Sequence, residues 1–176
     1  SSSHTVGPLR AGRDFAARTH ALPGLARVTC ALYGSLGATG IGHGTPDAVV
    51  AGLQGHEPET VDPDVVRGAW TEWSDGAPLV VGGETPVPFA RADIAFQPRT
   101  RLPGHPNAMT LQAWDAAGAV LAEDTYYSIG GGFIRREGAD VEVASGPFPL
   151  QFSTAAELLA LCDERGLTIA EAARRN

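Results

Sequence analysis

Cysteine is scarce in this sequence, which has only Cys30 and Cys162 among its 176 residues. Two thiols are too few for a disulfide framework or a four-cysteine metal cluster. Cys30 lies in an apolar run typical of a buried strand, and Cys162 lies on a helical pattern. Both are therefore interpreted as small core residues in a reducing compartment, and we expect a cytoplasmic protein.

Basic residues are also few, because 13 Lys and Arg stand against 20 Asp and Glu, for a formal charge of -7. We expect no nucleic-acid partner, since binding phosphates requires a basic face. No apolar run approaches the roughly 18 residues of a membrane span, and no signal-peptide pattern is visible, so we expect no membrane partner. A content of 43% hydrophobic and 19% charged residues is typical of a globular chain with a core.

The 22 glycines and 13 prolines are distributed along the chain without a repeat or a linker. They predict many tight turns within one α+β domain over 1–176, with helices packed on a mixed or antiparallel sheet. Hydrophobic periodicity predicts helices over 9–18, 48–53, 64–73, 155–162 and 168–173, the last two packed on the sheet. Strands are predicted over 28–33, 79–81, 87–89, 92–96, 108–114 and 120–129, and a solvated turn over 135–138.

The glycine-rich segment 34–47 is predicted to be a turn between the first strand and the helix over 48–53. Thr45 is predicted to cap that helix, with Pro46 at its first position and Asp47 in its first turn. His43 lies between two glycines just before the helix, where a substrate can approach the backbone. The positive end of the helix favours an anion and disfavours a charged imidazole. A neutral His43 beside a carboxylate has the chemistry needed to remove the proton α to that carboxylate.

Three serines and His4 precede the first predicted helix. Their hydroxyl groups can cap that helix or donate hydrogen bonds to a bound anion. Spacing alone leaves two simpler interpretations open. The serines then form a flexible polar terminus, and His43 is a surface-loop histidine.

Five separated motifs carry a resemblance to a known family. They are 1–8 with 10–12 (SSSHTVGP, RAG), 33–36 (YGSL), 40–45 (GIGHGT), 105–109 (HPNAM) and 125–133 (TYYSIGGGF). In this order they resemble the β domain of iron-sulfur-dependent L-serine dehydratases. The resemblance implies conversion of L-serine to pyruvate and ammonia without pyridoxal phosphate. It also implies an α+β fold similar to the allosteric substrate-binding domain of D-3-phosphoglycerate dehydrogenase.

The resemblance further implies a [4Fe-4S] cluster that acts as a Lewis acid and is held by cysteines of a separate α domain. Cys30 and Cys162 do not match those ligands. The chain is therefore expected to bind no cofactor itself and to be the β part of a longer enzyme, or a β subunit. Its expected partners are L-serine, the iron-sulfur α domain or subunit, and a second copy in a homodimer.

Roles in such an enzyme follow from the motif residues. The resemblance implies that His43 is the base at Cα, that His4 handles a second proton, and that Asn107 is a hydrogen-bond partner. The residues expected to bind the substrate carboxylate are Ser1, Ser2, Ser3, Thr5 and Gly44. His105 is expected at least to orient its loop. The alternative is a non-catalytic allosteric module that binds serine or another anion and dimerises, although sensing a carboxylate needs donors and no base such as His43.

Overall fold

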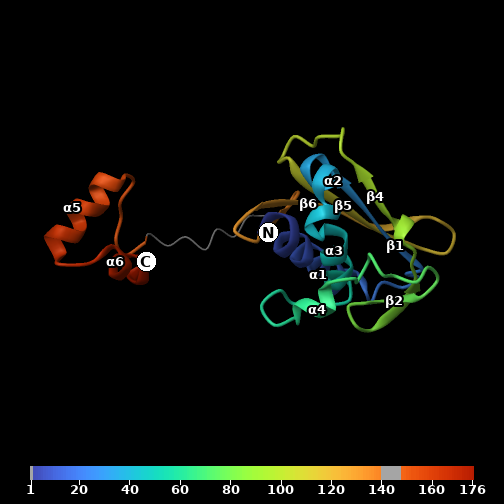
Figure 1. The fold of residues 1–176 in the computed structure, drawn as a ribbon. Helices are drawn as coiled ribbons and strands as arrows, with labels where there is room; N and C mark the ends of the chain where they lie inside the picture. Colours follow the sequence, from blue (N-terminus) through green and yellow to red (C-terminus); the bar gives the residue numbers. More distant parts are fainter. Residues whose placement is uncertain (1, 140–147) are drawn as a thin grey trace. The chain divides into compact units, whose positions relative to one another are not determined.

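The computed structural model of the chain describes residues 2–139 and 148–176 (Figure 1). The chain divides into two compact units between Ala139 and Asp140. Helical segments of the first unit are η1 (Ser2–Val6), α1 (Gly7–Thr19), α2 (Gly34–Thr39), η2 (Ile41–His43), α3 (Thr45–Leu53), α4 (Pro63–Val66) and η3 (Arg91–Asp93). The second unit contains α5 (Ala155–Arg165) and α6 (Ile169–Arg175). The α+β class is confirmed, whereas a single β domain over 1–176 stays a prediction.

The central sheet of the first unit is mixed, with the strand order β4-β1-β5-β6-β7. Its strands are β1 (Arg27–Tyr33), β4 (Ile94–Gln97), β5 (Asn107–Trp114), β6 (Val120–Gly130) and β7 (Phe133–Arg136). β1 runs parallel to β4 and antiparallel to β5, and the β5–β6 and β6–β7 pairs are antiparallel. A separate hairpin joins β2 (Pro78–Val81) to β3 (Thr85–Pro88). The sheet, predicted to be mixed or antiparallel, is mixed.

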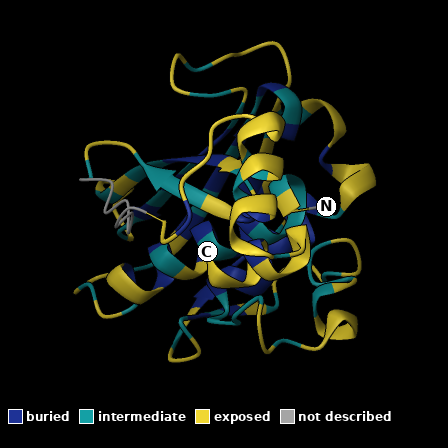
Figure 2. Cartoon of the chain, turned by 90° about the vertical axis from the view of Figure 1, so that its left-hand side faces the viewer, coloured by how far each residue is buried: buried dark blue, intermediate teal, exposed yellow. Residues whose placement is uncertain are grey.

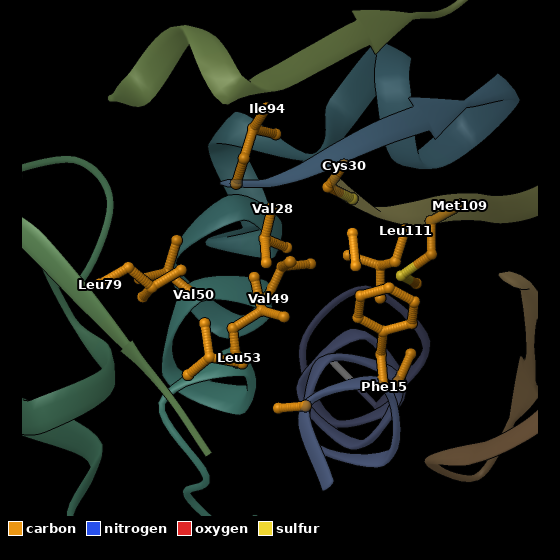
Figure 3. Packing of buried hydrophobic residues seen from close by; sticks show 14 of the residues in the cluster. Phe15, Val28, Cys30, Val49, Val50, Leu53, Leu79, Ile94, Met109 and Leu111 are labelled. Atoms are coloured by element: carbon orange, nitrogen blue, oxygen red, sulfur yellow. The ribbon is translucent and has the colours of Figure 1, made fainter. Parts of the chain in front are cut away.

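The core lies between the central sheet and the helices α1 and α3, as Figure 3 shows. Alternate residues of β1 point into it, including Val28 and Cys30, because successive side chains of a strand face opposite sides. Phe15 of α1 and Val49 of α3 meet them from the helical side, and both are fully buried. Burial of such a side chain contributes roughly 1.5–3 kcal/mol, so this layer sets where the two helices lie.

The helix predicted over 64–73 is wrong beyond its first turn. The Asp62 carboxylate caps α4 by accepting the Asp64 N–H, but the helix ends at Val66. Gly68 follows at a φ of +85°, outside the helical region. The buried Asp47 carboxylate then accepts the backbone N–H groups of Trp70 and Thr71. Asp47 therefore holds this turn, a contact that a helix would not allow.

The turn predicted over 34–47 contains a helix that the sequence did not reveal. Residues 34–39 form α2, followed by the 3-10 turn η2. The predicted N-cap is also wrong, because Gly44 in the left-handed region, at φ +65°, precedes α3. The Thr45 hydroxyl instead donates to the His4 carbonyl. A contact across 41 residues has replaced a local one.

Two further predictions need correction. Residues predicted as a solvated turn over 135–138 include Arg135 and Arg136, which pair with β6 as part of β7. The strand predicted from 92 begins at Ile94, because the Asp93 carboxylate accepts the Ala90 N–H and closes the 3-10 turn η3. Pairing with β6 decided the first conformation, and a local bond across three residues decided the second.

The second unit confirms its two predicted helices. Thr154 and Thr168 each cap a helix through a reciprocal bond with a glutamate three residues later, and Gly166 ends α5 at a φ of +61°. Most of α5 and α6 is exposed (Figure 2), and Leu150, Cys162 and Ala172 form a small buried cluster. Their predicted packing on the sheet stays a prediction. Within the described ranges, no helix combines the length and apolarity of a membrane span.

Candidate functional site

Two helix starts meet at the candidate site. His4 lies in η1, which continues directly into α1, and His43 ends η2, just before α3. The helices α1 and α3 are in backbone contact, since a Cβ atom on Gly52 of α3 would lie 2.1 Å from the Leu9 carbonyl oxygen of α1. A Cβ atom on Gly12 would likewise lie 2.6 Å from the Val49 carbonyl oxygen. This close approach brings the ring centroids of His4 and His43 to 4.9 Å, at an interplanar angle of 43°.

The His43 ring is exposed and held at one nitrogen. Its Nδ1 lies 3.0 Å from the Thr39 carbonyl oxygen, which can only accept, so Nδ1 carries the proton. The Thr5 hydroxyl donates to the His43 carbonyl at 3.0 Å and fixes its backbone. In the neutral ring the lone pair is therefore on Nε2, which makes no hydrogen bond to any residue in 2–139. His43 presents the free nitrogen of a general base.

His4 is enclosed by hydroxyl groups. Its Nδ1 lies 3.1 Å from Ser3 Oγ, and its Nε2 lies 3.2 Å from Ser35 Oγ and 3.1 Å from Thr39 Oγ1. Partial burial and the neighbouring His43 lower the pKa of the His4 imidazole below its ordinary value. His4 is thus neutral at neutral pH, so it places no positive charge beside the His43 ring.

The lowered pKa of His4 predicts a pH dependence of stability. A histidine with a folded pKa below its unfolded value binds more protons when unfolded, so the free energy of unfolding falls as the pH drops below about 6.5. Urea unfolding of the chain between pH 7.5 and 5 should show this decrease, and the His4→Asn variant should show a shallower one. Equal slopes for both proteins would contradict the assignment.

A pocket of about 500 Å³ opens beside His43. It is lined by Thr5, Val6, Leu9, His43, Gly44, Asp47, Pro58, Val61, Pro63, Val66 and Arg67. The start of α3 offers this pocket few free amides, because Thr45 N–H donates to the Gly40 carbonyl and Pro46 has no N–H. The helix is therefore a smaller contributor to anion binding than segment 34–47 alone indicated.

The structure brings together most of the residues predicted for the site. Thr5, His43 and Gly44 line the pocket, and Ser3 and His4 adjoin them through the ring contact. Ser2 is exposed one residue away. Ser1 lies outside the described residues.

Asn107 lies on a neighbouring strand end. Its backbone bridges to Gly34, next to the Ser35 that contacts His4, and its N–H donates to His105 Nδ1 at 3.1 Å. His105 therefore contacts its own loop, and its role stays a prediction. The Asn107 side chain makes no hydrogen bond within residues 2–139 and 148–176, so its role stays a prediction.

Sequence reasoning missed two residues of the site, Ser35 and Thr39. Both contact His4, and Thr39 also contacts His43. Residues four positions apart share one helix face, so a prediction of α2 would have placed their side chains together. The glycines around them favoured a turn instead.

Comparison with known proteins identifies the family to which this chain is similar. The family described as serine dehydratase beta chain matches residues 1–139. An L-serine dehydratase of Mycobacterium tuberculosis is 43% identical over 183 residues, covering 100% of this chain and 39% of that protein. An L-serine dehydratase of Streptomyces coelicolor is 45% identical over 177 residues, covering 96% of this chain and 39% of that protein. L-serine dehydratase 1 of Escherichia coli is 40% identical over 184 residues, covering 100% of this chain and 40% of that protein. The chain thus spans about two fifths of the length of these relatives.

Proposed function

Because the chain belongs to the serine dehydratase beta-chain family, we propose that it is the β part of an L-serine ammonia-lyase. In this proposal it contributes the general base and carboxylate-binding groups to an active site completed by another domain. The observation that carries the proposal is His43, which lines a pocket of about 500 Å³ and has an anchored Nδ1 and a free Nε2.

The proposed chemistry starts with the proton on Cα of L-serine. His43 Nε2 takes this proton and becomes an imidazolium, whose Nδ1–H remains bonded to the Thr39 carbonyl. Over the whole reaction, L-serine loses the α proton and the β hydroxyl as water, and hydrolysis of the resulting enamine gives pyruvate and ammonia. The neutral His4 beside His43 avoids a second positive charge that would oppose this protonation.

The substrate carboxylate is proposed to bind among the hydroxyl groups near the two rings. Ser2 and Ser3, together with Ser1, precede His4, and Thr5 and Gly44 line the pocket itself. Ser3 shares its hydroxyl with His4 Nδ1, so a bound carboxylate competes with that bond. Asn107 is proposed as a further donor from the β5 end.

The side chains that the structure describes do not fit a [4Fe-4S] cluster. Cys30 is 2% exposed within the core, and its burial raises the pKa of the thiol, so it is not a thiolate ligand. Cys162 is buried in the second unit, and no group of three metal-ligating side chains occurs in residues 2–139 and 148–176. We place the cluster on a partner, an iron-sulfur α domain or subunit. A homodimer and a cytoplasmic location remain part of the proposal.

The proposal is tested by assaying pyruvate formation from L-serine. The complete protein containing this chain, with its iron-sulfur domain, should form pyruvate, and the 176-residue chain alone should not. Pyruvate formation by the pure chain without iron would contradict the shared site. An inactive complete protein that still binds L-serine would favour the allosteric module instead.

A further inference from the structure

Thr39, the last residue of α2, contacts both histidines of the candidate site. Its carbonyl oxygen accepts the His43 Nδ1–H at 3.0 Å, and its hydroxyl oxygen lies 3.1 Å from His4 Nε2. The carbonyl is available because the last carbonyls of a helix have no partner within the helix. At the C-terminus of α2 the chain turns into η2 and returns the His43 ring to this carbonyl.

The hydrogen atoms of this cluster can be assigned. The Thr39 hydroxyl donates its only hydrogen to the Ser35 carbonyl at 3.0 Å, one helical turn earlier. Its oxygen can then only accept from His4, so His4 Nε2 carries a proton. In the neutral ring His4 Nδ1 is an acceptor, and the Ser3 hydroxyl donates to it at 3.1 Å. The two adjacent rings therefore hold opposite tautomers.

We infer that Thr39 is a positioning residue that sets both tautomers, with the proton on Nδ1 of His43 and on Nε2 of His4. Its carbonyl directs the His43 lone pair outward, and its hydroxyl fixes the His4 ring beside it. The catalytic consequence rests on the proposed function, since Thr39 itself does not line the pocket. The assignment of tautomers does not depend on that function.

The test uses Thr39→Val, which removes the hydroxyl and keeps the carbonyl, with Thr39→Ser as the conservative variant. Nitrogen-15 NMR of labelled histidine in the chain should show the Nε2–H tautomer for His4 in the wild type and in Thr39→Ser. In Thr39→Val the Ser35 hydroxyl, 3.2 Å from the same Nε2, can either donate or accept, so we expect a mixture for His4. The His43 tautomer should stay Nδ1–H, because the Thr39 carbonyl is kept. Thr110→Val is a matched control, because the Thr110 hydroxyl bonds to Thr125 on the sheet and touches neither ring.

In the complete enzyme, kcat of Thr39→Val should fall about tenfold with KM unchanged, while Thr39→Ser and Thr110→Val stay near the wild type. An Nδ1–H tautomer for wild-type His4, or an unchanged His4 signal in Thr39→Val, would overturn the inference. So would a loss of the His43 tautomer in Thr39→Val, which would indicate a displaced α2, or a changed His4 tautomer with an unchanged kcat. If the wild-type enzyme does not act on L-serine, the proposed function fails while the NMR result still decides the tautomers.

Discussion

Under the proposed function, replacing His43 by alanine in the complete enzyme is expected to lower kcat with L-serine by about 10²–10⁴-fold, the range of a lost general base. The His43 ring is exposed, and its Nε2 is free beside the pocket, so the loss is chemical and the fold is retained. Steady-state pyruvate formation measures the effect, and the unfolding midpoint of the variant should stay close to the wild-type value.

His56→Ala is the matched control, because His56 lies in the loop after α3 and does not line this pocket. It should keep wild-type kcat. A near-normal kcat for His43→Ala would remove His43 from the mechanism. If His43→Ala changed only the dependence of the rate on serine concentration, the allosteric module would be favoured.

The second large effect is expected at the helix crossing. Gly52→Ala should destabilise the chain by about 2 kcal/mol, even though alanine is about 1 kcal/mol better than glycine within a helix. The new Cβ atom would lie 2.1 Å from the Leu9 carbonyl oxygen and 2.9 Å from the Arg13 nitrogen, both on the backbone of α1. The helices must separate, which also moves His4 away from His43. Urea unfolding and the activity of the complete enzyme should therefore both decline.

Gly42→Ala is the control for this steric argument, because no atom lies within 4 Å of a Cβ placed at Gly42. Its unfolding midpoint should remain near that of the wild type. Equal stability of the Gly52 and Gly42 variants would show that the crossing tolerates a wider spacing, and the glycine contact would then not set the distance between the rings.

Elements with strong local patterns could be predicted from the sequence. Apolar residues typical of strands predicted β1 and β5, the central strands of the sheet. Apolar residues at helical spacing predicted α1, which contains the buried Phe15. The helices α5 and α6 were predicted as well, and each is capped by a threonine that bonds to a glutamate only three residues away. The turn held by Asp47 was predicted wrongly because its partner lies 23 residues away in the chain. The strand β7 was predicted as a solvated turn although it pairs with β6, the strand just before it.

Some features of the candidate site could likewise be predicted from the sequence, and others could not. Its residue types were visible in the sequence, because a histidine between glycines and a run of hydroxyl groups are local features. The roles of Ser35 and Thr39 were not visible, since their hydroxyl groups act on a ring more than 30 residues away in the chain. The hydroxyl of Thr45 was assigned to a local cap and serves the His4 backbone instead.

By itself, the sequence determined which segments are buried, which residues can accept a proton, and the kinship with serine dehydratases. These features depend on patterns and motifs that span only a few neighbouring residues. Only the tertiary structure decided that His4 and His43 meet and which nitrogen of each carries the proton. The physical reason is that the meeting of the rings depends on how closely α1 crosses α3, where backbone atoms meet at Gly12 and Gly52. The two protons depend on where the end of α2 places Thr39 beside both rings.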